Sequence, residues 1–430
     1  MPNAFFGSYA TNGAQCRYNG VITPASDNYR LGFPGANGAL HIMQPLVDIG
    51  TPRGLIVGGG TPNLVAENTF TGDTVLRDGR LFLGRKLALQ NSALNVGNGV
   101  DGNTGKICFN NGPGNGAPTP QDVVDEPHLG GLIGSRNLAS IYSSSNQNNT
   151  SRLAIGDIVG ITLNVDSGKT HTYSGNARLS TGMYLTKDGP GTQVLSGTND
   201  YTGPTSIATG TLSLGTTGSI ADSTLLAIGA GGTLDTSGQA SYAIPATQTV
   251  DFGIQSAGAG SAGKIVADEL DISSATVTYN ISGPLDDAAY VLATYTSLVG
   301  ANFASVPAPP SGYTLNYAYE GNKIALVPTG VVGPTDEDDA VSIADFTSSL
   351  GFDPTGGGGT GGTTGAASGT FAGFSGGSYS VEWSPDLVTL FTTVFGPEAG
   401  TGTSGTAGVA IPWSYDTDDT EGFFRLVITP

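Results

Sequence analysis

The residues best suited to bind a metal form one acidic run, at positions 336–339. Within it, Asp336 and Asp338 keep the every-second-residue carboxylate spacing of calcium loops. Such loops also need a glycine at their sharp turn, and here Ala340 and Val341 interrupt the pattern instead. The run therefore predicts one of two things, a calcium site at Asp336 and Asp338 or a solvated acidic linker, and calcium is the one cofactor that the sequence raises.

Other residue types that could do chemistry are scattered. His41, His128 and His171 lie far apart, none has a second ligand type at metal spacing, and we expect each at a surface or corner position. No G-x-S-x-G elbow occurs with a suitable order of His and Asp. The glycine-rich tracts lack the following Lys-Ser/Thr of a phosphate loop. We predict no catalytic residue and no cofactor-binding residue, and hence no enzyme.

Residues 73–86 form the densest charged stretch, so a catalytic site would be expected there if the chain were an enzyme. Polysaccharide lyases and hydrolases need clustered or paired carboxylates, the lyases with a basic residue beside them. In this stretch the charges flank a Gly turn, where a solenoid exposes its side chains, so surface salt pairs are expected and a polysaccharide-active enzyme is the least favoured alternative. The charged residues are Asp73, Arg77, Asp78, Arg80, Arg85 and Lys86.

Cys16 and Cys108 are the two cysteines of the chain. Two cysteines in 430 residues do not make a disulfide framework. A single disulfide between them, formed in an oxidising compartment, would tie the N-terminal segment to the first turns. The alternative is two separate buried thiols, and the sequence leaves both open.

Composition excludes several classes of partner. Glycine supplies 68 residues, charged residues only 12%, and the net charge is −19. Nucleic-acid binding needs clustered positive charge, which is absent. No run of 18 apolar residues is present, so we expect no membrane insertion. The first residues lack a basic and apolar signal pattern, so export is inferred from composition and resemblance. Short runs of Val, Ile, Leu and Thr between glycines predict an all-β protein.

An internal repeat gives the architecture. NTFTGDTVLRDGRLFLG begins at Asn68, and NDYTGPTSIATGTLSLG begins at Asn199. In each copy an aromatic residue and a Thr-Gly pair mark a corner, and two alternating leucines follow on one face of a strand. One such unit cannot bury its apolar face alone, whereas stacked units form a continuous core. The matched positions are Asn68, Phe70, Gly72, Leu81 and Leu83 with Asn199, Tyr201, Gly203, Leu212 and Leu214.

These segments resemble the autotransporter-associated β-strand repeat, whose pattern is roughly Leu-Ser-Gly-x-Asn-x-Tyr-Thr-Gly-x-Thr followed by Gly-Thr-Leu-x-Leu-Gly. The copy that starts with Leu195 fits closely; the copy at Asn68 departs upstream. The resemblance covers about residues 15–328 and implies a right-handed parallel β-helix in an exported bacterial surface protein, with no chemistry. That pattern also carries a C-terminal translocator barrel. Residues after Pro328 are too few and too glycine-rich for one, which implies another export route.

Four segments are predicted. Residues 1–20 form an N-terminal cap or inter-subunit strand, and residues 21–329 form the parallel β-solenoid. Residues 330–370 are an acidic and then Gly/Thr-rich flexible linker. Residues 371–430 form a small β-sandwich-like module, similar to the module behind such repeats in surface proteins of Verrucomicrobia-like bacteria. At roughly 20 to 25 residues per coil, the solenoid should have about 12 to 14 coils.

A secreted or cell-surface structural protein is the predicted function. Solenoid ends carry open strands that template further pairing, so we expect the chain to assemble with itself, end to end or by strand addition, into a fibre or layer. The alternative is a monomeric adhesin that binds a cell-surface glycan. Aromatic residues of the C-terminal module could stack on sugars or form its core; they are Tyr379, Trp383, Trp413 and Tyr415.

Overall fold

A computed structural model describes most of the chain and divides it into two compact units. One unit comprises Met1–Asp286, Tyr290–Ala308 and Asn316–Ala325, and the other comprises Asp287–Ala289, Pro309–Leu315 and Leu326–Pro430. The described residues are 4–8, 15–32, 39–100, 102–112, 121–143, 152–255, 261–285 and 288–329, with the strands at 351–353, 365–372, 378–384, 392–399, 410–417 and 423–429.

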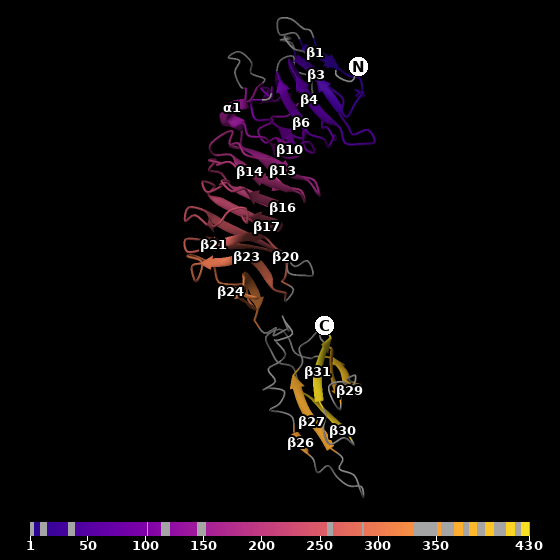
Figure 1. Cartoon of the computed structure of the whole chain (residues 1–430), viewed down its shortest axis with the longest axis vertical. Coiled ribbons are helices and arrows are strands. Elements are labelled where there is room, and N and C mark those ends of the chain that lie inside the picture. Colours follow the sequence, from indigo (N-terminus) through magenta and orange to yellow (C-terminus); the bar gives the residue numbers. More distant parts are fainter. Residues whose placement is uncertain are drawn as a thin grey trace. The chain divides into compact units, whose positions relative to one another are not determined.

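The first part of the solenoid is built from two parallel sheets, to which each turn contributes one strand apiece (Figure 1). Sheet I contains β1 (Gln15–Tyr18), β3 (Ala39–Ile42), β5 (Thr61–Leu64), β7 (Arg80–Leu83) and β9 (Lys106–Phe109), in that order. Sheet II contains β2 (Asn28–Leu31), β4 (Gly54–Gly58), β6 (Thr74–Asp78), β8 (Leu94–Asn95) and β11 (Leu132–Ile133).

The second part is a 15-stranded sheet in which two parallel ladders meet, because β16 and β17 bend across both. Ladder III contains β10 (His128–Leu129), β12 (Gly160–Asn164), β14 (Tyr184–Asp188), β16 (Thr205–Leu214), β17 (Leu225–Asp235), β19 (Thr249–Gln255) and β22 (Thr276–Ser282). Ladder IV contains β13 (Thr170–Tyr173), β15 (Thr192–Leu195), β16, β17, β21 (Lys264–Asp271) and β23 (Tyr290–Val299). The remaining strands of this sheet are β18 (Tyr242–Ala243), β20 (Ser261–Ala262), β24 (Tyr313–Tyr319) and β25 (Lys323–Pro328).

The described residues thus form an all-β, right-handed solenoid of about 11 turns with almost no helix. The helical pieces are α1 (Leu138–Ile141) and the 3-10 turn η1 (Ile155–Asp157). The estimate of 12 to 14 coils was too high, because some turns are longer than expected: Leu234 pairs with Ile265 and Val250 with Val277. The predicted boundary at residue 21 was also late, since β1 already pairs with β3.

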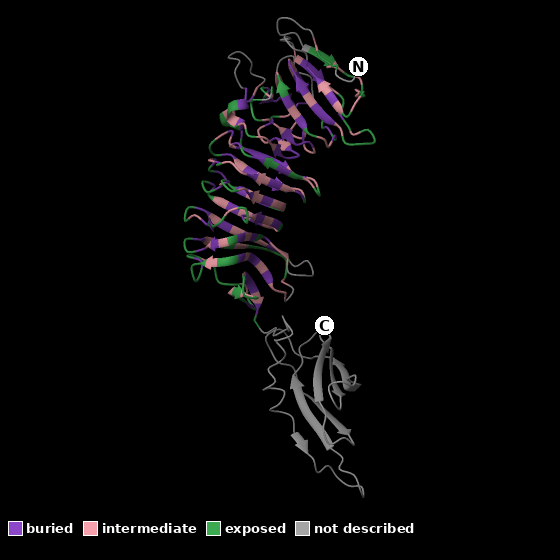
Figure 2. Cartoon of the chain, in the orientation of Figure 1, coloured by how far each residue is buried: buried purple, intermediate pink, exposed green. Residues whose placement is uncertain are grey.

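The interior is a stack of apolar side chains, one layer per turn. Along ladder III, Leu185 aligns with Thr205 and then Leu226; every second residue is buried along β14 and along both arms of β16, on either side of its bend. Figure 2 shows this alternation along the strands of the solenoid. Because side chains alternate with period two, an in-register parallel stack places like positions directly above one another. Short apolar runs are therefore enough to form a continuous core.

Asn68 and Asn199 hold the same corner in the two repeats. The Asn199 amide oxygen accepts from the Ala177 backbone N–H at 2.8 Å, and its nitrogen donates to the carbonyls of Gly197 and Ser219 at 2.9 and 3.1 Å. Asn68 likewise accepts from one neighbouring turn, at Leu46, and donates to the next, at Ala88. Each asparagine is almost fully buried and connects three successive turns.

The glycines of the repeat stand where a side chain has no room. A Cβ at Gly203 would lie 2.3 Å from the Met183 carbonyl oxygen, and one at Gly72 would lie 2.6 Å from the Arg53 backbone. Behind these glycines a Thr-Ser pair repeats. Thr205 donates to Ser223, which donates to the Gly203 carbonyl. Thr74, Ser92 and Gly72 form the same arrangement.

Between the two parts, sheet I ends and ladder III begins. Strand β9 is the last of sheet I, and β10 is the first of ladder III. Across this junction the turns are joined by two short strand pairs, β8 with β11 and β10 with β12, and otherwise by single bridges such as Gly134 with Tyr173. Arg136 reinforces it: its guanidinium donates to the carbonyls of Val96, Asn103, Gly105 and Thr104.

The C-terminal strands pair into two three-stranded antiparallel sheets. One has the order β26 (Gly351–Asp353), β27 (Gly365–Ala372), β30 (Ala410–Thr417), and the other has the order β29 (Thr392–Ala399), β28 (Ser378–Ser384), β31 (Phe423–Thr429). Antiparallel pairing distinguishes these strands from the parallel solenoid. That the two sheets pack as a sandwich stays a prediction.

Candidate functional site

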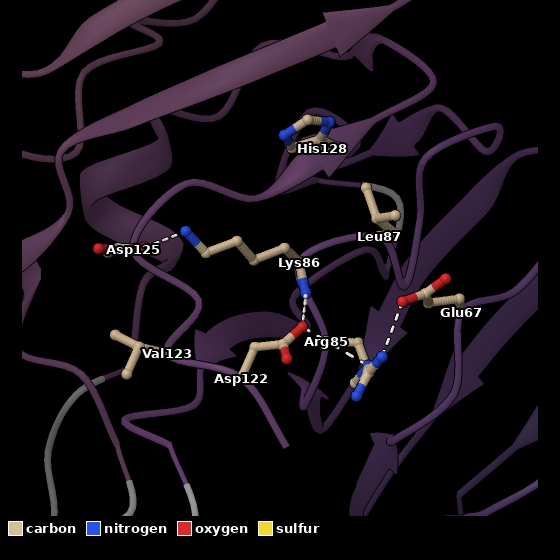
Figure 3. A pocket seen from close by; sticks show the side chains of 8 residues that line it. All are labelled: Glu67, Arg85, Lys86, Leu87, Asp122, Val123, Asp125 and His128. Atoms are coloured by element: carbon tan, nitrogen blue, oxygen red, sulfur yellow. Dashed lines mark hydrogen bonds and ion pairs between the residues drawn. The ribbon is translucent and has the colours of Figure 1, made fainter. Parts of the chain in front are cut away.

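An open pocket of about 570 Å³ lies at the junction where ladder III begins (Figure 3). One wall of the pocket is formed by the segment that follows β7, and another by the segment that leads into β10. Charged side chains dominate its lining, which consists of Glu67, Arg85, Lys86, Leu87, Asp122, Val123, Asp125 and His128.

The charges of the pocket are paired with one another. Arg85 contacts Glu67 at 2.7 Å and Asp122 at 3.5 Å, and the Lys86 ammonium lies 2.7 Å from Asp125. Asp122 also accepts from the Lys86 backbone N–H at 3.0 Å. In Figure 3 these side chains point toward one another across the pocket. The pairs hold three sequence-distant segments together at the point where the sheets change.

This arrangement has the residue types of an acid–base site but not its geometry. Each of the carboxylates Glu67, Asp122 and Asp125 already faces a cation, so none is poised as an unpaired acid or base. No group of three or more His, Cys, Asp or Glu side chains among the described residues could hold a metal ion. The pocket can therefore bind or pair charges.

Of the charged stretch at 73–86, Arg85 and Lys86 form the ion pairs. Asp73, Arg77 and Asp78 are exposed, and no ion pair is found for them among the described residues. The carboxylates that pair with Arg85 and Lys86 are Glu67, Asp122 and Asp125. These pairs were not predicted, because their members lie up to 39 positions apart in sequence with no spacing that would indicate contact.

Two of the three histidines are not surface residues, which corrects the expectation. His41 is 4% exposed and bonded to Asn63 at 3.0 Å, and burial together with the Arg17 charge lowers its pKa to about 4. Burial also lowers the pKa of His171. His41 lies on β3, where both faces are largely covered, and His171 lies on the inward face of β13, whose other face is exposed. His128 is half-exposed at the pocket.

Lys187 is a buried charged residue that was not predicted from the sequence. It is fully buried, and its ammonium donates to the carbonyls of Gly189, Asp188 and Thr209 at 2.7, 2.9 and 3.2 Å. Burial lowers its pKa to about 8. The signal was present, since alternation in YLTKD places Lys187 in phase with buried Leu185. The ammonium thus provides hydrogen-bond donors for backbone carbonyl groups of two neighbouring turns.

The structure keeps the two cysteines apart. Cys16 is exposed on β1, Cys108 is buried on β9, and both are free thiols. They occupy the opposite edge strands of sheet I. Four strand spacings of about 4.8 Å exceed by far the Cα separation that a disulfide spans. The alternative of separate thiols therefore holds, with one of them exposed.

Asp336 and Asp338 lie outside the described residues. The aromatic residues of the C-terminal module fall on its strands: Tyr379 and Trp383 on β28, and Trp413 and Tyr415 on β30. They thus belong to different sheets.

Comparison with known proteins identifies the repeat. Residues 57–81 and 185–214 match the family model of the passenger-associated-transport-repeat. These matches overlap the two copies that begin at Asn68 and Asn199. No curated protein and no solved structure matches the chain. Among the described residues, no helix has the length and apolar character to cross a membrane.

The repeat match and the parallel stack agree on a class. The chain carries β-solenoid repeats of the autotransporter passenger type. The residues that define the repeat, Asn199 and Gly203 among them, act in the packing of one turn on the next.

Proposed function

We propose that this chain is a secreted structural subunit that assembles end to end into a fibre or layer at the cell surface, without catalytic activity. The observation that carries the proposal is the ladder of parallel strands, which runs to both ends of the solenoid with no helical cap among the described residues. Among the described strands, β1 at the first turn pairs only with β3; at the end of ladder III, β22 pairs with β19 and its outer edge is bridged only at Thr276, by Ser305, while ladder IV ends in β25 and β24. Unpaired edges of this kind recruit further strands.

Further support comes from how the residues are used. The buried polar side chains that would draw attention in an enzyme are committed to holding turns together, as Asn68, Asn199 and Lys187 are. The pocket charges pair internally. Passenger-type repeats fit an exported, surface-exposed protein.

Electron microscopy of the purified full-length chain, over a range of concentrations and with and without calcium, tests the proposal. We expect unbranched filaments with an axial repeat near one solenoid length, roughly 50 Å for about 11 turns. A requirement for calcium would assign a role to Asp336 and Asp338.

Isolated rods at every concentration would contradict self-assembly. In that case the second candidate, a monomeric adhesin, would be tested by glycan binding with the aromatic residues of β28 and β30 replaced. Release of sugar from a polysaccharide would instead contradict the non-enzymatic assignment.

A further inference from the structure

The C-terminal end of ladder III leaves interior positions incompletely covered. Ile281 of β22 aligns with Ile254, which is 1% exposed, yet Ile281 itself is 38% exposed. Tyr279 aligns with the fully buried Phe252 but is only half-buried; its hydroxyl is buried and has no hydrogen-bond partner among the described residues. Both positions continue the core stack, but no further turn of ladder III lies over them in the described part of the chain.

The backbone of the same edge is also open. The Val277 N–H donates to the Ser305 carbonyl at 2.9 Å, so the odd-numbered residues of β22 direct their backbone groups away from β19. Past this single bridge, no described strand pairs with the outer edge at Tyr279 and Ile281.

The N-terminal end presents the matching surface. On β1, Cys16 and Tyr18 align with the buried Leu40 and Ile42, so they occupy interior positions of the first turn. Cys16 is nevertheless exposed and Tyr18 is half-buried. On the neighbouring sheet II, the edge of β2 is bridged by Phe6, which accepts from Gly32 and donates to Arg30. Among the described strands, β1 is thus the open one.

Charge selects the direction of joining. Residues 1–190 carry 13 Lys and Arg against 12 Asp and Glu, a net charge of +1. Residues 191–329 carry 2 against 10, a net charge of −8. Contact between two C-terminal ends would bring like charges together, whereas contact between an N-terminal and a C-terminal end sets a near-neutral surface against a negative one.

From these observations we infer that β1 of a second copy of this chain pairs in parallel with β22, with Cys16 over Tyr279 and Tyr18 over Ile281. This inference rests on the proposed self-assembly and names its joint.

Disulfide trapping tests the joint, because Cys16 already supplies one thiol. Neighbouring strands lie about 4.8 Å apart, within the Cα separation that a disulfide spans. In this register Cys16 faces position 279, so the full-length variant Tyr279→Cys, assembled and mildly oxidised, is expected to give a ladder of dimers, trimers and higher species on non-reducing electrophoresis. Position 281 lies roughly 8 Å from Cys16 on the diagonal, so Ile281→Cys should crosslink far less. Cys108 should not contribute, since it is fully buried and its pKa is raised to about 12.

Two controls accompany the test. Adding Cys16→Ser to Tyr279→Cys should abolish the ladder. Val100→Cys, at a loop position that is 82% exposed, should give no ladder beyond that of the parent chain. Folding of each variant is checked by circular dichroism.

The outcomes separate the joint from the assembly itself. Filaments by microscopy without a ladder from Tyr279→Cys would overturn the joint and leave self-assembly standing. A dimer that persists in Tyr279→Cys with Cys16→Ser would mean tail-to-tail contact and would also overturn it. Absence of both filaments and ladder would defeat the proposed function as well.

Discussion

At the scale of single residues, Lys187 shows how this solenoid uses polar groups. An ammonium inside an apolar stack is costly unless its donors are satisfied, and here three carbonyls from two turns surround it. Burial nevertheless lowers its pKa to about 8, below the value near 10.4 of an unfolded lysine. Between these values the unfolded chain binds more protons than the folded chain, so stability rises with pH in that window.

We predict that Lys187→Met removes this dependence. The free energy of unfolding of the parent chain should rise from pH 8 to pH 10 by up to about 2 kcal/mol relative to the variant. The window stops at pH 10, because tyrosines such as the half-buried Tyr184, whose pKa is raised to about 12, begin to lower stability above it. Urea denaturation at fixed pH values measures the difference. Parallel pH profiles for the two proteins would contradict the assignment.

How far the sequence predicts individual residues depends on whether a pattern repeats. Asn68 and Asn199 stand out by their recurrence, and both hold the corner that the recurrence indicates. Lys187, His41 and Arg136 occur once each, and their roles depend on carbonyls or side chains from other turns. No local pattern records such partners.

At the scale of the element, tight stacking makes glycine obligatory at some positions and optional at others. Gly203→Ala should destabilise the solenoid by about 2 kcal/mol, because the new methyl group would meet the Met183 carbonyl oxygen at 2.3 Å. Gly231→Ala is the matched control: its nearest neighbour would lie at 3.7 Å, and alanine there should be neutral or slightly stabilising. Thermal or urea unfolding compares the pair. Equal losses in both variants would contradict the packing argument.

Strand periodicity predicted the elements of the regular turns well. The alternating leucines Leu81, Leu83, Leu212 and Leu214 are buried on strands β7 and β16. The exchange of sheet I for ladder III was not predicted, because it arises where the segments around residues 85–143 depart from the repeat. The pocket ion pairs, which lie in that departure, were unpredictable for the same reason.

At the scale of the whole molecule, the uneven charge governs association. Residues 330–430 add a net charge of −12 to the −8 of residues 191–329, so copies of the chain repel one another in dilute salt. We therefore predict that raising salt from about 20 to about 500 mM lowers the concentration at which the chain assembles, since the Debye length falls from roughly 20 Å to below 5 Å. Sedimentation measures this threshold. A threshold that rises with salt would show that attractive ion pairs, and not buried interior side chains, dominate the joint.

The solenoid as a whole follows from the two repeat copies and the glycine-rich composition, whereas its number of turns and its ends do not. The longer turns, such as the one from Leu234 to Ile265, contain no turn signal from which their length could be predicted. Whether an end is capped depends on segments such as Phe6, whose single bridge to β2 has no sequence signature.

The change of sheet at the junction has a mechanical consequence. A pulling force along the solenoid axis loads the hydrogen bonds between turns directly, since the strands run across that axis. Most turns share the load over two ladders, but at the junction one two-residue strand pair, β8 with β11 or β10 with β12, carries it together with single bridges such as Gly134 with Tyr173, the Arg136 guanidinium and the pocket ion pairs. Under tension we therefore expect the contacts between turns to break first near the middle of the solenoid, which would leave the turns on either side folded.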